Sequence, residues 1–164
     1  MKAKKLTAMA LLVALGTAAS MFHIPILGAK AFPVQHAINV LAAVFFGPGP
    51  AVLIAFLVGL LRNLLGMGTL LAFPGGMVGA LVAGLIYRTW QRDFAAAIGE
   101  VFGTGVLGAL LSVPLARMFL GQEATAFAYI IPFGLSSLAG AVIGLVVLKV
   151  GAFAWQKAGE RSKV

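Results

Sequence analysis

Cysteine is absent from the 164-residue chain, which excludes disulfide bonds, thiolate metal ligands and a cysteine nucleophile. Charged residues are also scarce: they make up 10% of the chain, whereas hydrophobic residues make up 62%. About a quarter of an ordinary soluble domain is charged, because its surface must be hydrated. The composition therefore predicts that lipid surrounds most of the chain, and it excludes most soluble enzymes and nucleic-acid-binding modules.

Acidic residues and histidines are too few and too scattered for the common catalytic or metal sites. The 4 acids are Asp93, Glu100, Glu123 and Glu160, and there are 2 histidines. No G-x-x-x-x-G-K-[ST] phosphate loop is present, so we expect no enzyme, no cofactor, no metal and no ATP hydrolysis by this chain alone. The string GTGVLG (103–108) matches a dinucleotide-binding pattern, but it lies in an apolar helical run and indicates helix packing.

Long apolar stretches predict an all-α integral membrane protein with one domain over residues 1–164. A membrane-spanning helix needs about 20 apolar residues. Breaks at glycine, proline and charged residues define transmembrane helices at about 6–22, 34–47, 50–66, 73–89, 95–119 and 126–150. The first stretch also resembles a signal peptide, but its apolar run continues through Met21 and Phe22, and its removal would leave an odd number of spans.

The positions of lysine and arginine predict the orientation of these six spans. With the N-terminus inside, the outer half of the chain holds only Lys30, Arg62 and Arg117, and the other basic residues lie on the inner side. This asymmetry predicts that both termini are cytoplasmic and that loops 22–33 and 66–74 lie outside. The net charge of +8 therefore indicates orientation rather than a nucleic-acid partner.

Polar side chains within the predicted spans indicate where a functional site lies, because such groups are costly in lipid. Gln35, His36 and Asn39 share one face of the second helix, and Arg62 and Asn63 lie near the outer end of the third. They either line a cavity open to the outside or hydrogen-bond the helices to one another. We favour the cavity for the first three, whereas Arg62 could equally extend to the outer headgroups.

Glu100 and Thr104, one turn apart in the fifth helix, are further binding candidates. The orientation places Glu100 nearer the inner surface than His36, so we expect these two residues not to meet. An intramembrane enzyme would need them to meet. Phe73 and Tyr129, near the outer loops, suit stacking on a flat ligand, although core packing also explains each one singly.

A row of small residues recurs every four positions along the first helix, at Ala10, Ala14 and Ala18. Small faces allow helix backbones to approach closely in a membrane. The row indicates either packing inside the bundle or docking onto another membrane protein, and spacing alone does not decide between them.

Three segments resemble the ThiW family of S components, the substrate-binding subunits of energy-coupling factor (ECF) transporters. They are KAFPVQHAINVLAAVFFGPGPAV (30–52), LLRNLLGMGTLLAFPGGMVGALVAGLIYR (60–88) and GEVFGTGVLGALLSVP (99–114). The resemblance implies a prokaryotic cell-membrane protein that binds hydroxyethylthiazole, the thiazole precursor of thiamine. It also implies docking, through the alanine row, onto a transmembrane coupling subunit that works with two ABC-type ATPase subunits.

A neutral flat ring with a hydroxyl tail suits an apolar slot with a few polar groups, which the candidates above can form. Other vitamins or precursors, such as thiamine or hydroxymethylpyrimidine, are alternative ligands. A cationic ligand such as thiamine would favour acids in the site, and the outer half offers only Glu123. A structural membrane protein without transport activity is the alternative from a different class.

Overall fold

The computed structural model describes residues 2–26, 29–121, 123 and 125–161. These residues form six helical rods and one short hairpin. The elements are α1 (Ala3–Ala19), β1 (Ile24–Ile26), β2 (Ala29–Ala31), α2 (Pro33–Phe46), α3 (Pro48–Leu64), α4 (Ala72–Trp90), α5 (Asp93–Phe102), the π-helix η1 (Gly103–Gly108), α6 (Ala109–Leu120) and α7 (Ala126–Arg161). Because α5, η1 and α6 continue without a break from Asp93 to Leu120, they form a single rod.

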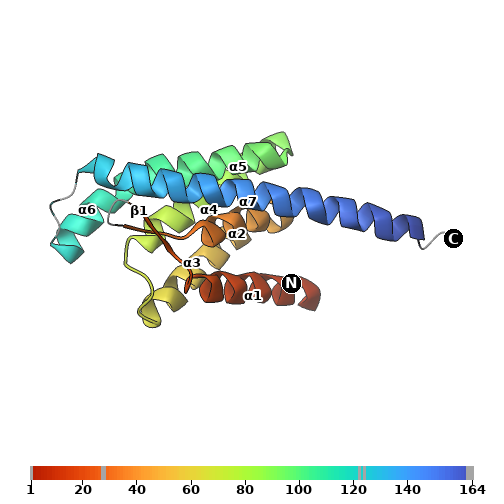
Figure 1. The fold of residues 1–164 in the computed structure, drawn as a ribbon, viewed down its shortest axis with the longest axis horizontal. Helices are drawn as coiled ribbons and strands as arrows, with labels where there is room; N and C mark the ends of the chain where they lie inside the picture. The colour runs from red at the N-terminus through yellow and green to blue at the C-terminus, as the bar shows by residue number, and fades with distance from the viewer. Residues whose placement is uncertain (1, 27–28, 122, 124, 162–164) are drawn as a thin grey trace.

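The rods form an elongated bundle with α2 and α4 at its centre (Figure 1). α2 packs against α1, α3, α4, α5 and α7, whereas α4 packs against α2, α3 and all three parts of the α5–η1–α6 rod. α1 lies at the periphery and packs on α2 and α3. α1 begins and α7 ends toward one end of the bundle, and the hairpin lies toward the other (Figure 1).

The helix bounds follow the predicted stretches closely, with two differences. α7 continues to Arg161, past the predicted end at residue 150, because Gly151 lies within the helix and does not end it. Part of the predicted loop 22–33 is an antiparallel hairpin in which Ile24 pairs with Ala31 and Ile26 with Ala29.

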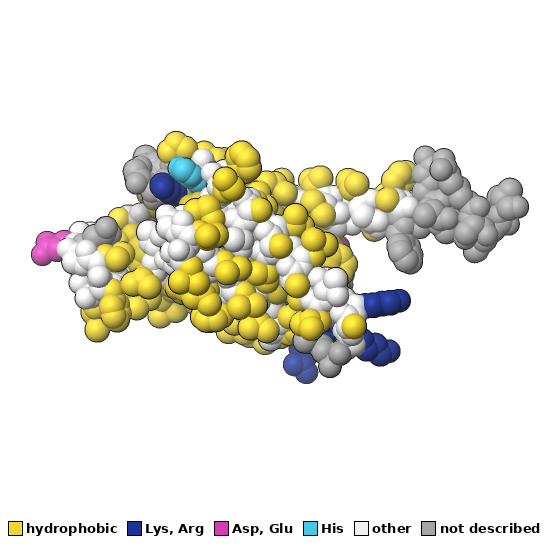
Figure 2. All heavy atoms as spheres, turned by 90° about the horizontal axis from the view of Figure 1, so that it is seen from below, with side chains coloured by type: hydrophobic (Ala, Val, Ile, Leu, Met, Phe, Trp, Pro, Cys, Tyr) yellow, Lys and Arg dark blue, Asp and Glu magenta, His cyan; other side chains and the backbone are white. Residues whose placement is uncertain are grey.

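By length and apolar composition, the rods Asp93–Leu120 and Ala126–Ala154 can cross a membrane, whereas α2 and α3 are apolar but shorter. The six-span topology therefore stays a prediction. Hydrophobic side chains cover much of the face seen in Figure 2, and several of the charged side chains lie toward its two ends. This distribution is that of a protein whose middle is surrounded by lipid.

Glycine and proline determine the tight connection between α2 and α3. Gly47 has a φ of 83°, a backbone conformation that side chains disfavour, and it alone separates the two helices. Pro48 and Pro50 then occupy the first turn of α3, where a missing N–H costs no helical hydrogen bond. This turn makes α2 and α3 antiparallel neighbours.

The GTGVLG string packs helices together, as the sequence indicates, but in a π-helix rather than an α-helix. A Cβ atom on Gly105 would lie 2.9 Å from the Cα atom of Gly134 in α7, and one on Gly108 would lie 2.8 Å from the Cα atom of Gly75 in α4. Such distances are closer than side chains allow. The glycines therefore let the α4 and α7 backbones contact this rod directly.

Replacing Gly105 by alanine tests this packing. We expect Gly105→Ala to lower the free energy of unfolding by about 1–3 kcal/mol, because the new methyl group overlaps the α7 backbone. Denaturant titration of the protein in detergent micelles measures the change. The matched control is Gly134→Ala, since nothing lies within 4 Å of the position its Cβ would take. Equal stability of the two variants would contradict the close approach.

Candidate functional site

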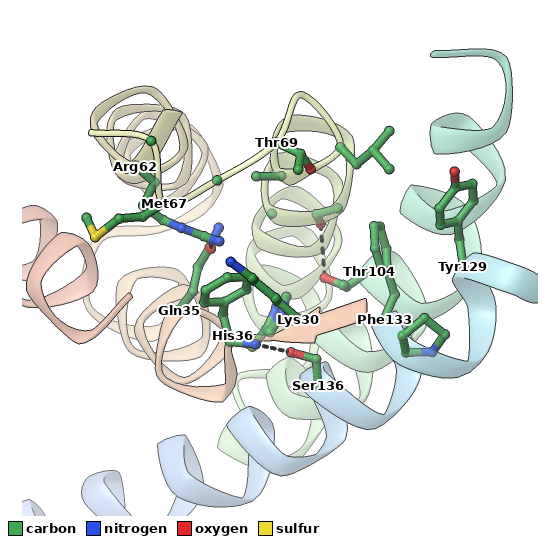
Figure 3. A pocket seen from close by; sticks show the side chains of 18 residues that line it. Lys30, Gln35, His36, Arg62, Met67, Thr69, Thr104, Tyr129, Phe133 and Ser136 are labelled. Carbon is green, nitrogen blue, oxygen red and sulfur yellow. Dashed lines mark hydrogen bonds between the residues drawn. The ribbon is translucent and has the colours of Figure 1, made fainter. Parts of the chain in front are cut away.

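A cavity of about 400 Å³ opens near the hairpin, between α2, α4, η1, α7 and the connection from α3 to α4 (Figure 3). This volume falls within the range of small-molecule pockets. Of the predicted binding residues, the cavity brings together Gln35, His36, Arg62, Thr104 and Tyr129. The residues come from separate helices, so the fold and not the local sequence assembles the site.

One corner of the cavity is built around Arg62, near the end of α3. Its side chain is buried, with an exposed fraction of 2%. The guanidinium carbon lies 3.6 Å from the ring centroid of Phe32, and Nη1 donates a hydrogen bond to Oε1 of Gln35. The burial is inconsistent with an arginine that extends to the headgroups, because that arrangement exposes the charged end.

The polar floor of the cavity is centred on Glu100, whose side chain is fully buried at 0% exposure. Its Oε1 atom lies 2.8 Å from Nδ1 of His36, 3.0 Å from Nδ2 of Asn39 and 3.0 Å from Oγ1 of Thr104. Nδ2 of Asn39 also donates to the carbonyl oxygen of Gly76. When Glu100 is ionised its oxygens only accept, so the contact places a proton on Nδ1 of His36. Of this group, His36 and Thr104 reach the cavity, and Asn39 and Glu100 support them from outside its lining.

The prediction that His36 and Glu100 lie at different depths is wrong. α2 has 14 residues and is therefore about 21 Å long, shorter than the ~30 Å hydrocarbon core. A residue count from the membrane surface gives the depth of a residue only for helices that cross the whole hydrocarbon core, and α2 is too short to do so. Glu100 lies about 10 Å along α5, and the two side chains meet in the interior.

Besides Asn39 and Glu100, two more predicted residues lie away from the cavity lining. Asn63 donates from Nδ2 to the carbonyl oxygens of Gly59 and Thr69 and thereby holds the α3–α4 connection. Phe73 packs against Phe56, with 5.7 Å between ring centroids, and neither ring is among the residues that line the cavity. Direct contact of Asn63 or Phe73 with a ligand therefore stays a prediction, and their positions outside the lining do not support it.

An aromatic wall closes the side of the cavity formed by α7. The rings of Tyr129 and Phe133 lie 6.0 Å apart, in a tilted arrangement (Figure 3). Ser136, one turn further along α7, accepts a hydrogen bond from the backbone N–H of Phe32 and so fixes the hairpin over the cavity. This contact connects α7 to the segment that precedes α2.

Sequence reasoning assigned no binding role to several lining residues, among them Lys30, Phe133 and Ser136. In the sequence, Lys30 serves only as evidence for membrane orientation. Its place in a predicted outer loop, close to the polar residues of the second helix, is a pattern that indicates a binding role as well. The serine pair at 136 and 137 inside an apolar run was a second signal. Phe133 carried none, since phenylalanine is ordinary in a membrane helix.

No cluster of three His, Cys, Asp or Glu residues that could hold a metal ion occurs among the residues that the structure describes. The residues that line the cavity offer hydrogen bonding, aromatic stacking and charge. These are means of binding a small molecule.

Comparison with protein families decides the class of function. Residues 6–152 match the family described as thiamine-precursor transporter protein (ThiW). The chain belongs to the ThiW family. A comparison with curated proteins found no match. The resemblance noted from three segments is thus confirmed over most of the chain, and ThiW is a family of transporters and not of enzymes.

The ThiW assignment gives the cavity a context. A transporter of a thiamine precursor must bind a small heterocyclic molecule, and it must do so within apolar surroundings. The meeting of His36 and Glu100, which an intramembrane enzyme would have required, fixes the His36 ring at the wall of the cavity. A purely structural protein without transport activity is not what this family contains.

A double-mutant cycle tests whether His36 and Glu100 act as one unit. We expect His36→Gln and Glu100→Gln each to destabilise the protein, and their combination to depart from additivity by about 0.5–3 kcal/mol, because each single change leaves the other group unpaired in the interior. Unfolding in detergent measures the effects. The control cycle pairs Glu100→Gln with Ser112→Ala, since Ser112 donates to the carbonyl oxygen of Gly108 and lies about 18 Å along the same rod. Additive effects in the first cycle would contradict the pairing.

Proposed function

We propose that this chain is the substrate-binding membrane subunit of an ECF-type importer that takes up hydroxyethylthiazole. The observation that carries the proposal is the cavity itself: a ThiW-family chain encloses a space lined by aromatic rings and by a few polar groups. This is the composition of sites that bind flat, weakly polar molecules.

The lining suits a thiazole ring better than thiamine. Phe133 and Tyr129 offer ring faces for stacking, and Thr104 and Gln35 offer hydrogen-bonding groups for the ring nitrogen and the hydroxyl. Thiamine carries a positive charge, and the residues that line the cavity include two cations and no acid. Such a lining disfavours a cationic ligand electrostatically.

The proposed topology has six membrane crossings, with both termini in the cytoplasm of a prokaryotic cell. The rods of the bundle support it, because α1 begins and α7 ends toward the same end (Figure 1). The cavity then faces the outside, where the hairpin and the α3–α4 connection lie. The bias of lysine and arginine toward the opposite end has the sign expected for this orientation.

The proposed partners are a transmembrane coupling subunit and two ABC-type ATPase subunits. Ala10, Ala14 and Ala18 are exposed on α1, whereas Met9, Val13 and Gly16 on the same helix are buried. The alanine row therefore does not pack inside this bundle, unlike Gly140 in α7, where a Cβ atom would overlap α2. An exposed row of small residues is a surface that a second helix can approach closely.

Ligand binding to the purified protein tests the function. We expect hydroxyethylthiazole to bind, and Phe133→Ala to weaken binding about three- to ten-fold, because one stacking surface is lost. Isothermal titration in detergent measures the dissociation constants. Ser112→Ala is the matched control, a buried side chain in the α5–η1–α6 rod outside the lining. Failure of hydroxyethylthiazole to bind, with binding of another vitamin, would overturn the substrate.

Assembly tests the docking surface separately. We expect Ala14→Trp to abolish co-purification with the coupling subunit and the ATPases, since a large side chain prevents close approach of helices. Binding of hydroxyethylthiazole by the isolated variant should persist, because α1 does not line the cavity. Leu85→Trp, at an exposed site on α4, is the control. An intact complex with Ala14→Trp would remove the alanine row from the interface.

A further inference from the structure

The charges at the cavity are unbalanced. Lys30 and Arg62 both line it, and the lining contains no aspartate or glutamate. Glu100 lies outside the lining, and its Oε1 atom contacts Nδ1 of His36 at 2.8 Å. Figure 3 shows the Lys30 side chain pointing in the direction of Arg62 and Gln35. Two cations directed at one space repel each other unless an anion lies between them.

Arg62 has the features of a ligand-binding arginine rather than those of a structural one. It is held in place by the Phe32 ring on one side and by Gln35 at Nη1, and neither partner neutralises its charge. Its Nε donor is buried and has no hydrogen-bond partner among the described residues. A buried arginine without a carboxylate is costly, and an oxyanion in the cavity beside the guanidinium would offset that cost.

The backbone adds to the same positive potential. α2 begins at Pro33 and α4 begins at Ala72, and the residues that precede both starts, Phe32 and Leu71, line the cavity. Neither helix has an acidic residue in its first turn or a side chain that caps its first amides. Both positive helix ends are therefore directed toward the cavity without a counter-charge from the protein.

We propose that Lys30 and Arg62 form an oxyanion subsite within the cavity. The group it takes is a carboxylate or a phosphate monoester carried by the small heteroaromatic ligand, and Arg62 holds this group with its planar donors while Lys30 closes over it from the hairpin. The inference rests on the proposed binding of thiazole compounds and deepens it: an anionic thiazole compound binds more tightly than hydroxyethylthiazole itself.

Titration of four probes into the purified protein in detergent tests the subsite. The probes are hydroxyethylthiazole, its phosphate monoester, the corresponding methylthiazole carboxylate, and inorganic phosphate. We expect at least one anionic thiazole to bind about ten-fold or more tightly than the alcohol, because charge-assisted hydrogen bonds in a buried site are strong. Lys30→Gln and Arg62→Gln should each reduce this preference.

Two variants guard against misfolding as an explanation. Lys30 is exposed on the hairpin, so Lys30→Gln tests the charge even where Arg62→Gln does not fold. Lys149→Gln removes an equal charge from α7, about 20 Å along the helix from Ser136, and should keep the wild-type preference.

The outcomes separate this proposal from the function itself. Binding of the alcohol as tightly as, or more tightly than, both anions overturns the subsite and leaves the thiazole importer standing. A preference for an anion that is unchanged in Lys30→Gln and Arg62→Gln also overturns it. If no thiazole compound binds, the proposed substrate fails. In that case, binding of inorganic phosphate that Lys30→Gln abolishes would still support the subsite. If inorganic phosphate does not bind either, both the substrate and the subsite are overturned.

Discussion

The buried carboxylate of Glu100 is the constraint on which the rest of the site depends. A carboxylate in the interior of an apolar bundle is tolerated only where donors surround it. Here the donors come from His36 and Asn39 on α2 and from Thr104 on η1, so one oxygen joins two rods of the bundle. The arrangement fixes the His36 ring and the Thr104 hydroxyl at the base of the cavity.

The glycines of α4 make that arrangement possible. A Cβ atom on Gly79 would overlap Oγ1 of Thr104 and lie 2.7 Å from Oε2 of Glu100, so only glycine leaves room for the polar cluster beside the helix. On the same helix, the carbonyl oxygen of Gly75 lies 3.0 Å from Oγ1 of Thr104, so it shares the single hydroxyl proton of Thr104 with Glu100. The small residues that allow close packing and the polar residues of the site thus depend on each other. Close packing brings the polar groups together, and the polar groups hold the helices at that distance.

Much of this could be predicted from the sequence. Apolar stretches bounded by glycine and proline determine the helices, because lipid leaves the backbone no other hydrogen-bonding partners. The cost of polar groups in lipid directed attention to Gln35, His36 and Arg62, which do share a cavity. The depth of Glu100 could not be derived by counting residues from a membrane surface, since that count assumes helices of full length and α2 is short. Likewise, Phe133 enters the site only through the packing of α7, which no local pattern records.

A structure of the protein with a bound thiazole compound tests the central claim most directly. The account predicts the ligand within the cavity, its ring against Phe133 and its polar atoms toward Thr104 and Gln35, with the His36–Glu100 contact retained. A ligand bound elsewhere, for example in the apolar groove between the α5–η1–α6 rod and α7, with side chains filling the cavity, would contradict it.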